Sequence, residues 1–354
     1  MKKIVFFLPA LGSGGAERVT VLISEQLIAE GYDVEILLLK NVVHYNVKSN
    51  VPITSVFEKD QSMGKFKRMR TIVSFLRNYI KKNDAVLVPM LNSCLRYSVL
   101  MKLLTRVKVI ACERNDPYSQ YKSKTQRWIR RKLFDLSDYA IFQTEDAKNF
   151  YSQKTKNKSV VIPNPVSLPE IKWEKNHNHT LVTVCRLNPQ KNLKMAVDAI
   201  GILKESVPDI HLNIYGEGAE ASALSEYIKE KGLESQISLC GTTKNTYEVL
   251  RQSNVFILTS DFEGISNSML EALAVGMPVI VTDCPIGGAK MMIRNDETGI
   301  LIPVGDTAML VQAVKRVLAD EAFAEKIGAQ SAESMKAYTL DKIANQWLDA
   351  VNKV

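Results

Sequence analysis

The sequence predicts an α/β protein with two doubly wound, Rossmann-like domains that face a cleft. Three observations predict this fold class. Short apolar strand patterns alternate with amphipathic helical patterns, which is typical of a parallel sheet wrapped by helices. The alternation stops at residues 160–179 and then restarts. The chain has 354 residues, which is long for one hydrophobic core.

In the first half of the chain, we expect buried strands at residues 3–8, 33–39, 85–90, 108–112 and 139–144. The pattern of residues 16–31 is helical and ends at Gly31. Residues 65–82 form a second helical pattern with one apolar stripe. This stripe contains Phe66, Met69, Ile72, Val73, Leu76, Tyr79 and Ile80. These elements make residues 1–165 the first domain.

The interruption holds three prolines followed by polar residues, which predicts a linker over residues 166–179. After it, strands are expected at residues 180–187, 211–218, 237–241, 255–260, 278–283 and 299–306. The helical patterns between them lie at residues 192–204, 219–231, 245–252 and 267–275. We expect residues 180–335 to form the second domain, and residues 336–354 to form a C-terminal helix that packs back on the first.

The composition is ordinary for a soluble protein, with 46% hydrophobic and 24% charged residues. The start of the chain imitates a secretory signal, but its short apolar run leads directly into a helical pattern, so a buried strand is favoured. No apolar run approaches the ~20 residues that span a bilayer. The five cysteines are scattered without metal-ligand spacing, which predicts free thiols in a reducing, cytoplasmic compartment and no metal site.

Charge is divided unevenly between the two halves. Residues 1–166 contain 28 Lys and Arg against 14 Asp and Glu, a net charge of +14, whereas residues 167–354 contain 18 against 24, a net charge of −6. The first half is therefore expected to meet an anionic partner. Its two most basic helical stretches contain Lys65, Lys67, Arg68, Arg70, Arg127, Arg130, Arg131 and Lys132. They are either solvated helix faces or a docking site for an anionic membrane.

A glycine-rich loop at residues 11–18 joins the first strand to the first helix. It is not the dinucleotide fingerprint G-x-G-x-x-G, because Glu17 stands where the last glycine belongs. Its amides can still approach an anion at a helix N-terminus, although a plain strand–helix turn is an equally simple interpretation.

Two cations follow the first strand of the second half. Arg186 ends that strand and Lys191 lies in the next loop or first helical turn. The planar guanidinium of Arg186 beside the ammonium of Lys191 suits a diphosphate. For either residue alone, a surface cation is the simpler interpretation. The turns at residues 216–218 and 240–245 could hold a flat base through their backbones, or could be turns only.

Two carboxylates flank the start of a later helix. Residues 261–266 follow a buried strand, and Ser266 or Asn267 is a plausible N-cap. The amides that follow Glu263 then point toward an anion, and Glu271 lies about one turn into the helix. A carboxylate beside bound phosphate should accept hydrogen bonds from hydroxyls, of a ribose for Glu271 and of a sugar ring for Glu263. A glycosidase carboxyl pair is the alternative.

At these stretches the sequence resembles family 4 of the retaining glycosyltransferases, which have the GT-B architecture. The segment EGISNSMLEALAVGMPVI matches the family's E-x7-E motif, and CRLNPQKN matches its R-x4-K motif. GEG at residues 216–218, VVIPNPV at 160–166 and GSGGAER at 12–18 match its other motifs. The matches keep the family's order from residue 4 to about residue 306.

The resemblance implies a role for each of these residues. Arg186 and Lys191 would bind the diphosphate of a UDP-sugar and stabilise its departure, and Glu263 would hold the transferred sugar. Glu271 would hold the ribose. Further donor-side positions would be Gly14, Gly15, Gly216, Thr242, Thr243, Gly264, Ile265, Ser266 and Asn267. Gly14 and Gly15 could instead lie near the acceptor. No metal or other cofactor is required, and the leaving phosphate would take the proton of the acceptor.

One position departs from the pattern of many family members. They carry a histidine after the fourth strand of the first domain, whereas this chain has Glu113, Arg114 and Asn115. The form ERNDP resembles a subgroup that includes N-acetylhexosaminyltransferases. These three residues would then lie on the acceptor side, with Arg114 contacting phosphate or acceptor.

The resemblance favours an acceptor linked to undecaprenyl diphosphate, in the synthesis of a cell-surface polysaccharide or glycan. The enzyme would work in the cytoplasm, peripherally at the inner face of the plasma membrane. An N-acetylhexosamine or a hexose is the first expectation for the transferred sugar. The alternatives are a GT-B glycosidase or epimerase-like enzyme on nucleotide sugars, and a basic nucleic-acid-binding protein. Nucleic acid is not expected, because no recognition motif accompanies the basic charge.

Overall fold

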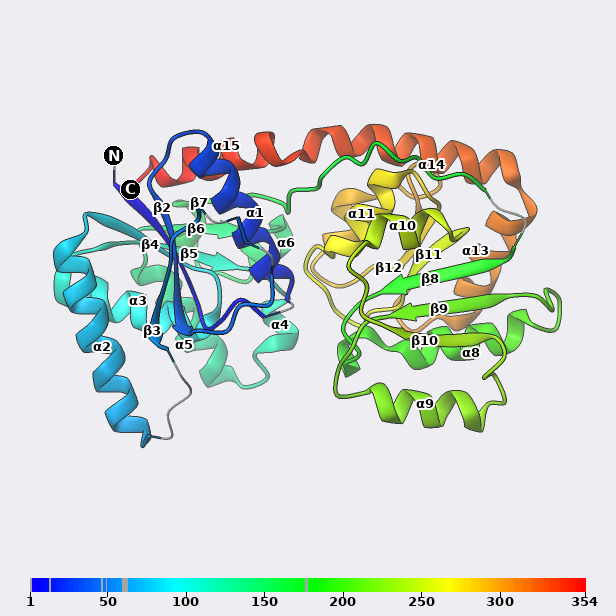
Figure 1. Ribbon diagram of the computed structural model, residues 1–354, viewed down its shortest axis with the longest axis horizontal. Helices are drawn as coiled ribbons and strands as arrows, with labels where there is room; N and C mark the ends of the chain where they lie inside the picture. The colour runs from blue at the N-terminus through cyan, green and yellow to red at the C-terminus, as the bar shows by residue number, and fades with distance from the viewer. Residues whose placement is uncertain (1, 13, 46, 49, 59–62, 176–177) are drawn as a thin grey trace. The chain divides into compact units, whose positions relative to one another are not determined.

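The structure is a computed structural model that describes residues 2–12, 14–45, 47–48, 50–58, 63–175 and 178–354. The chain forms two compact units, one of residues 1–165 with Leu340–Val354 and one of Val166–Thr339. Each unit contains a parallel sheet with helices packed around it (Figure 1). The predicted fold class, two doubly wound α/β domains, is therefore confirmed. The cleft stays a prediction.

The first unit holds a seven-stranded sheet in the order β3-β2-β1-β4-β5-β6-β7. Its strands are β1 (Lys3–Leu8), β2 (Val34–Lys40), β3 (Ile53–Phe57), β4 (Ala85–Pro89), β5 (Lys108–Glu113), β6 (Tyr139–Phe142) and β7 (Ser159–Val161). In the buried centre, Phe6 of β1 pairs with Ile36 on one side and Val88 on the other. The strand order reverses between β1 and β4, and ligands of such sheets bind at the carboxyl ends beside that reversal.

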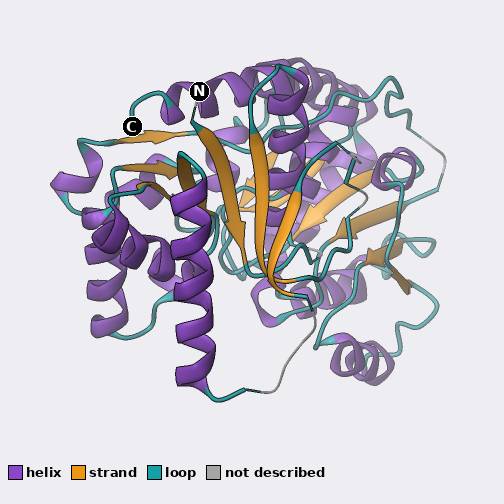
Figure 2. Cartoon of the chain, turned by 60° about the vertical axis from the view of Figure 1, so that its left-hand side comes forward, coloured by secondary structure: helices purple, strands orange, loops and turns teal. Residues whose placement is uncertain are grey.

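Helices cover this sheet on both faces, as Figure 2 shows for the orange strands and the purple helices around them. α1 (Gly15–Ala29) packs against the C-terminal helix α15 (Leu340–Val351), and α2 (Lys65–Lys82) packs against α3 (Asn92–Thr105). The remaining helices of the unit are α4 (Pro117–Gln120), α5 (Lys124–Leu136), α6 (Glu145–Asn149) and α7 (Gln153–Lys156).

The apolar stripe predicted on α2 is only partly in the core. Ile72 and Leu76 are buried, but Phe66 is 69% exposed and Met69 is 43% exposed. Figures 1 and 2 show the reason, because the first turns of α2 extend beyond the strands on which they would have to pack.

The segment predicted as a linker, residues 166–179, is held by the second unit at Val166 and Trp173, and its residues 176 and 177 lie outside the described residues. The backbone N–H of Val166 donates to the carbonyl of Tyr338 at 2.9 Å. The backbone N–H of Trp173 donates to the carbonyl of Val275 at 2.9 Å, and its indole Nε1–H donates to the carbonyl of Ser253 at 2.7 Å. These bonds extend the second unit back to residue 166.

The second unit holds a six-stranded sheet in the order β10-β9-β8-β11-β12-β13. Its strands are β8 (Thr180–Val184), β9 (His211–Tyr215), β10 (Ile237–Gly241), β11 (Val255–Leu258), β12 (Val279–Thr282) and β13 (Ile300–Ile302). Its helical segments are η1 (Pro189–Lys191), α8 (Leu193–Leu203), α9 (Ala221–Glu230), α10 (Thr246–Arg251), α11 (Asn267–Val275), α12 (Gly288–Met292), α13 (Thr307–Ala319), α14 (Glu321–Met335) and η2 (Lys336–Tyr338). The strand order reverses between β8 and β11, so the loops after these two strands meet at the reversal.

After η2 the chain passes into the first unit as α15. There the fully buried ring of Trp347 meets the edge of Phe6, with the ring centroids 5.6 Å apart. In the described part of the chain, no helix is both long enough and apolar enough to cross a bilayer.

Candidate functional site

The loops after β8 and β11 meet through an ion pair. Lys191 Nζ lies 2.5 Å from Glu263 Oε2, and the two side chains are only 9% and 19% exposed. Lys191 ends the short helix η1, whereas Glu263 lies in the turn before α11. The structure thus brings together the residue predicted to bind phosphate and the residue predicted to bind sugar.

Glu263 is held by more than its ion pair. Its Oε2 also accepts hydrogen bonds from Gln190 Nε2 and from Ser260 Oγ, each at 3.2 Å. Gln190 Nε2 donates in addition to the carbonyl of Phe262 at 2.8 Å. The carboxylate is therefore fixed through one of its two oxygens. We did not predict Gln190 or Ser260, although their places next to Lys191 and in the turn before Glu263 were a usable signal.

Further hydrogen bonds hold the two loops together. The backbone N–H of Asp261 donates to the carbonyl of Gln190 at 2.9 Å, and Asn192 Nδ2 donates to Asp261 Oδ1 at 2.8 Å. Thr259 Oγ1 lies within hydrogen-bond distance of the carbonyls of Lys191 and Asn192, at 3.0 and 3.1 Å. Because backbone atoms carry most of these bonds, the spacing of Lys191 and Glu263 is set by the fold of the unit.

The start of α11 completes the turn. Ser266 is its N-cap, since its hydroxyl accepts a hydrogen bond from the backbone N–H of Met269 at 3.4 Å. Gly264, Ile265 and Ser266 are buried, and Asn267 is half-buried. A side chain on Gly288 would put its Cβ 1.8 Å from the carbonyl oxygen of Gly264, so these two backbones can touch only because residue 288 is glycine.

The other two predicted charged residues lie at the same edge of the sheet. Arg186 is exposed and follows the carboxyl end of β8. Glu271 lies inside α11 and is 3% exposed, a degree of burial at which a carboxylate needs hydrogen bonds or a charge partner. Their predicted contacts with the donor stay predictions.

Gly216 and its neighbours have a packing role. Gly216 has a φ of +141°, and a Cβ on it would lie 1.8 Å from the carbonyl oxygen of Cys185. Its backbone N–H donates to the carbonyl of Gly241 at 2.7 Å, which ties this turn to the end of β10. Thr242, which follows, is exposed, and Thr243 Oγ1 accepts a hydrogen bond from the backbone N–H of Asn245 at 3.1 Å. The turn therefore supports the strand end that carries Arg186.

In the first unit, the glycine loop leads into α1. Gly14 is the N-cap residue, but no side chain caps the helix through it, and Gly15 is exposed. Ser13 lies outside the described residues. A Cβ on Gly14 would fall 2.1 Å from Glu17 Oε2, so the carboxylate of Glu17 folds back over the helix start. A negative charge at this place complements the helix dipole and would repel a phosphate. The predicted contacts of Gly14 and Gly15 with donor phosphates or with the acceptor stay predictions.

Glu113 and Arg130 form a buried ion pair in the first unit. Glu113 is 2% exposed and Arg130 is 3% exposed, with Arg130 Nη2 lying 3.0 Å from Glu113 Oε2. Arg130 also donates to Asn92 Oδ1, to the carbonyl of Cys112 and to Tyr151 Oη. Burial alone would lower the pKa of Arg130, but the Glu113 carboxylate raises it. Arg130 is therefore a buried structural cation, and its prediction as a surface cation is wrong.

Arg114 lies at the carboxyl end of β5, where many family members have histidine. Its Nη2 donates to Asn164 Oδ1, and its guanidinium carbon lies 5.8 Å from the ring centroid of Trp347. Its Nε and Nη1 are buried and find no hydrogen-bond partner among the described residues. Burial lowers the pKa of Arg114 to about 10, so it remains charged at neutral pH. Asn115 Oδ1 accepts a hydrogen bond from the backbone N–H of Asp116 at 2.8 Å.

Comparison with known proteins gives the same result for both halves of the chain. Residues 13–169 match the family described as Glycosyltransferase Family 4, and residues 169–334 match Glycosyl transferases group 1. An uncharacterized glycosyltransferase of Haemophilus influenzae is 25% identical, with 98% of this chain and 99% of the relative covered. An N-acetylgalactosaminyltransferase of Campylobacter jejuni, whose name gives a diphospho-undecaprenol glycan as its substrate, is 26% identical, with 98% and 99% covered.

The fold is also shared with solved structures. HepE from Anabaena, crystallised with UDP and glucose, superposes with a TM-score of 0.89 over the full length of both chains, at 16% identity. At this identity the likeness concerns the fold alone. The two family matches together span residues 13–334, and the chain is a glycosyltransferase with the GT-B fold.

Proposed function

We propose that this protein is a retaining glycosyltransferase that moves a sugar from a UDP-sugar to a lipid-linked glycan. The observation that carries the proposal is the contact between Lys191 and Glu263 beside the N-terminus of α11. A cation suited to a departing phosphate and a carboxylate suited to sugar hydroxyls stand together at the strand-order reversal of one sheet.

The reaction breaks the bond between the anomeric carbon and the phosphate oxygen, and the electron pair leaves with UDP. Arg186 and Lys191 stabilise the negative charge that develops on the diphosphate. The acceptor hydroxyl oxygen bonds to the anomeric carbon on the face that UDP leaves, and its proton passes to the leaving phosphate. Lys191 has to turn from Glu263 toward the phosphate, which releases Glu263 to accept hydrogen bonds from the sugar. Glu271 holds the ribose.

The relatives support the choice of substrates. The Campylobacter jejuni relative is named for transfer to a diphospho-undecaprenol glycan, and HepE was crystallised with UDP. We therefore infer a UDP-linked N-acetylhexosamine or hexose as donor and an undecaprenyl-diphosphate-linked glycan as acceptor. This role lies in the synthesis of a surface polysaccharide or related glycan, at the inner face of the plasma membrane. The chemistry needs no metal, because Arg186 and Lys191 supply the positive charge.

The test is a screen of nucleotide sugars with a lipid-linked acceptor, read by mass spectrometry and by NMR of the new anomeric centre. One UDP-sugar should be consumed, with its anomeric configuration kept in the product. Glu263→Gln should lower transfer strongly without loss of UDP binding, since UDP lacks the transferred sugar that residue 263 holds. Inversion at the anomeric carbon would contradict the retaining mechanism, and release of free sugar without any transfer would indicate a hydrolase.

A further inference from the structure

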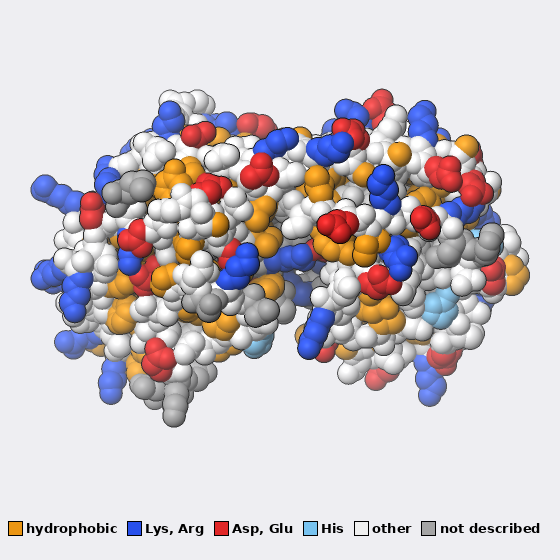
Figure 3. All heavy atoms as spheres, turned by 45° about the horizontal axis from the view of Figure 1, so that its top comes forward, with side chains coloured by type: hydrophobic (Ala, Val, Ile, Leu, Met, Phe, Trp, Pro, Cys, Tyr) orange, Lys and Arg blue, Asp and Glu red, His pale blue; other side chains and the backbone are white. Residues whose placement is uncertain are grey.

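The first turns of α2 expose apolar side chains among cations. Phe66 and Met69 are 69% and 43% exposed, although large apolar side chains usually find cover. The cations next to them are Lys65, Lys67, Arg68 and Arg70. Along its whole length α2 contains seven Lys and Arg residues and no Asp or Glu. On the face shown in Figure 3, blue Lys and Arg side chains stand out along the edge of the first unit that holds α2 in Figure 1.

This helix end lacks the features that normally stabilise a helix start. Its N-cap is Gly64, which makes no side-chain cap, and its first turn has cations where acidic residues are favourable. The other end is ordinary, since Lys81 and Lys82 complement the negative end of the helix dipole. When one end of an otherwise regular helix departs from the usual capping and charge pattern, that end is typically a functional surface. An anionic surface would turn the unfavourable charges into favourable ones.

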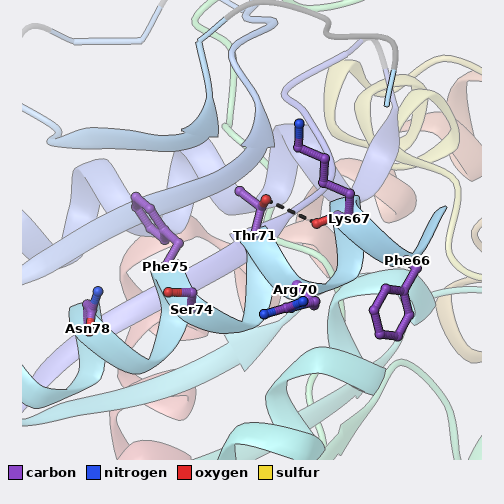
Figure 4. A pocket seen from close by; sticks show the side chains of 7 residues that line it. All are labelled: Phe66, Lys67, Arg70, Thr71, Ser74, Phe75 and Asn78. Carbon is purple, nitrogen blue, oxygen red and sulfur yellow. Dashed lines mark hydrogen bonds between the residues drawn. The ribbon is translucent and has the colours of Figure 1, made fainter. Parts of the chain in front are cut away.

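An open strip of surface runs along one face of α2 from this end (Figure 4). The strip is lined by Phe66, Lys67, Arg70, Thr71, Ser74, Phe75 and Asn78, which all belong to α2. The guanidinium of Arg70 lies 5.9 Å from the ring centroid of Phe66, and Thr71 Oγ1 donates to the carbonyl of Lys67 at 3.0 Å. The lining therefore offers two cations, two hydroxyls and one amide beside two aromatic rings, which suits a phosphate-bearing headgroup with an apolar tail.

We propose that the first turns of α2 dock this unit on an anionic lipid bilayer. Phe66 and Met69 enter the apolar part of the interface, and the surrounding cations meet lipid phosphates. A helix with charge of one sign and exposed apolar side chains at its tip fits a bilayer surface, whereas nucleic acid would leave both apolar side chains unused. The inference rests on the proposed function for the purpose of docking alone. A lipid-linked acceptor lies in that bilayer, so an enzyme that uses it has to reach the bilayer surface.

The position of this end of α2 fits that purpose. α2 follows β3, so its first turns lie at the carboxyl edge of the sheet, and Arg68 there stacks 5.4 Å from the ring centroid of Phe57, the last residue of β3. Gly14 and Arg114 follow the carboxyl ends of β1 and β5, at the same edge. Docking through α2 therefore brings the acceptor side of this unit toward the lipid headgroups.

The second predicted basic stretch, on α5, does not share this role. Arg130 is buried with Glu113. Arg127 donates to the carbonyls of Tyr121 and Tyr118, and Arg131 donates to the carbonyl of Phe150. Three of its four cations are thus bound to the protein itself, so the docking surface is α2.

The first experiment measures binding of the full chain to vesicles of phosphatidylcholine, with and without phosphatidylglycerol. Binding should need phosphatidylglycerol and weaken with salt, because exposed charges are screened within ~8 Å at physiological ionic strength. Lys67→Glu with Arg70→Glu should weaken it at least about 25-fold, since each cation near such a surface contributes about fivefold. The matched control, Lys81→Glu with Lys82→Glu, changes the net charge equally at the other end of α2 and should have little effect. Equal losses in both variants would overturn the proposal.

The second experiment tests insertion. In Phe66→Trp, the new tryptophan should show a blue-shifted emission when vesicles with phosphatidylglycerol are added. Leu103→Trp is the control, because Leu103 is 63% exposed on α3 and lies near the start of β5, at the opposite edge of the sheet. The absence of a blue shift at residue 66 would overturn insertion. Tighter binding of an oligonucleotide, unchanged in Phe66→Ser, would reassign the surface to nucleic acid.

A third measurement separates docking from chemistry. With Lys67→Glu and Arg70→Glu, transfer to a long-chain lipid acceptor should fall, whereas transfer to a short water-soluble acceptor should hold. A fall in both rates would mean that these cations belong to the reaction site, which overturns docking as their role. If vesicle binding behaves as proposed but no nucleotide sugar is consumed, the proposed function fails while the docking surface stands.

Discussion

At the residue scale, the main result is that Lys191 and Glu263 are each other's partners. Sequence reasoning identified both, because each follows a buried strand and belongs to a motif of charged residues. It missed Gln190, because the place of this residue next to Lys191 was a signal but a sequence does not show that its amide contacts Glu263. It also placed Arg130 on the surface, because a periodic pattern cannot show that Glu113, seventeen positions earlier, provides a buried partner.

Lys191→Ala should lower the rate of sugar transfer by ~10²–10³, the usual cost of losing one group that stabilises charge in the transition state. The protein should still fold, because Gln190 and Ser260 continue to hold Glu263. Arg251→Ala is the control, since Arg251 is an exposed cation of the same unit and pairs with Glu248. Steady-state transfer kinetics test this, and near-normal turnover in a folded Lys191→Ala variant would remove Lys191 from the mechanism.

Gln190→Ala should raise the KM for the UDP-sugar about tenfold, the loss expected for one hydrogen bond to a charged group. The affinity for UDP should stay constant, because Gln190 acts on the sugar only through Glu263. Gln190→Glu should raise this KM more than Gln190→Ala does, since it puts a second carboxylate beside that of Glu263. Calorimetry with UDP, run alongside transfer kinetics, separates the two quantities. A parallel loss of UDP affinity would mean that Gln190 supports the whole loop.

At the element scale, the alternation of strand and helix patterns predicted both sheets. The missed strands, β3 and β7, are edge strands whose side chains are mostly half-buried, and β7 has three residues, so neither gives a strong apolar run. The exposure of Phe66 and Met69 at the start of α2 also could not be seen in the sequence. Periodicity tells which face of a helix is apolar, but it cannot tell where the sheet beneath that face ends.

Gly216→Ala should destabilise the second unit by about 2–5 kcal/mol, because the new Cβ meets a carbonyl oxygen in addition to adopting a strained φ. Gly305→Ala is a matched control, since Gly305 also has a positive φ, +78°, but no atom lies within 4 Å of a Cβ there. It should lose only the strain of a left-handed residue, about 1–2 kcal/mol. Urea unfolding followed by the fluorescence of Trp173 tests both variants. Equal losses of unfolding free energy would show that the backbone shifts to relieve the contact between the new Cβ and the carbonyl of Cys185.

At the scale of the whole molecule, the two units share one continuous chain but keep separate cores. The chain leaves the first unit after residue 165 and returns to it at Leu340. Sequence reasoning anticipated that return, and the contact of Trp347 with Phe6 gives it a physical cause, because a large aromatic ring needs a pocket.

Trp347→Ala should destabilise the first unit by about 3–5 kcal/mol, the usual cost of removing a buried aromatic ring. The second unit should keep its own transition, because Trp347 belongs to the first unit. Trp128 and Trp173 report on the two units separately, so replacing either by Phe in the same background assigns each fluorescence change. Trp128→Phe is mild, since Trp128 is 61% exposed. Loss of both transitions together would show that the units unfold as one.

The ion pair of Lys191 and Glu263 also bears on how fast the product dissociates from the enzyme. In the proposed reaction, a nucleotide that binds to Lys191 has to displace the Glu263 carboxylate, which returns to Lys191 when the nucleotide leaves. Part of the binding free energy of the nucleotide is thus used to break this ion pair, which weakens the binding of donor and product alike. The proposed reaction releases UDP in every cycle, so weaker binding of this product at Lys191 favours its release and hence turnover.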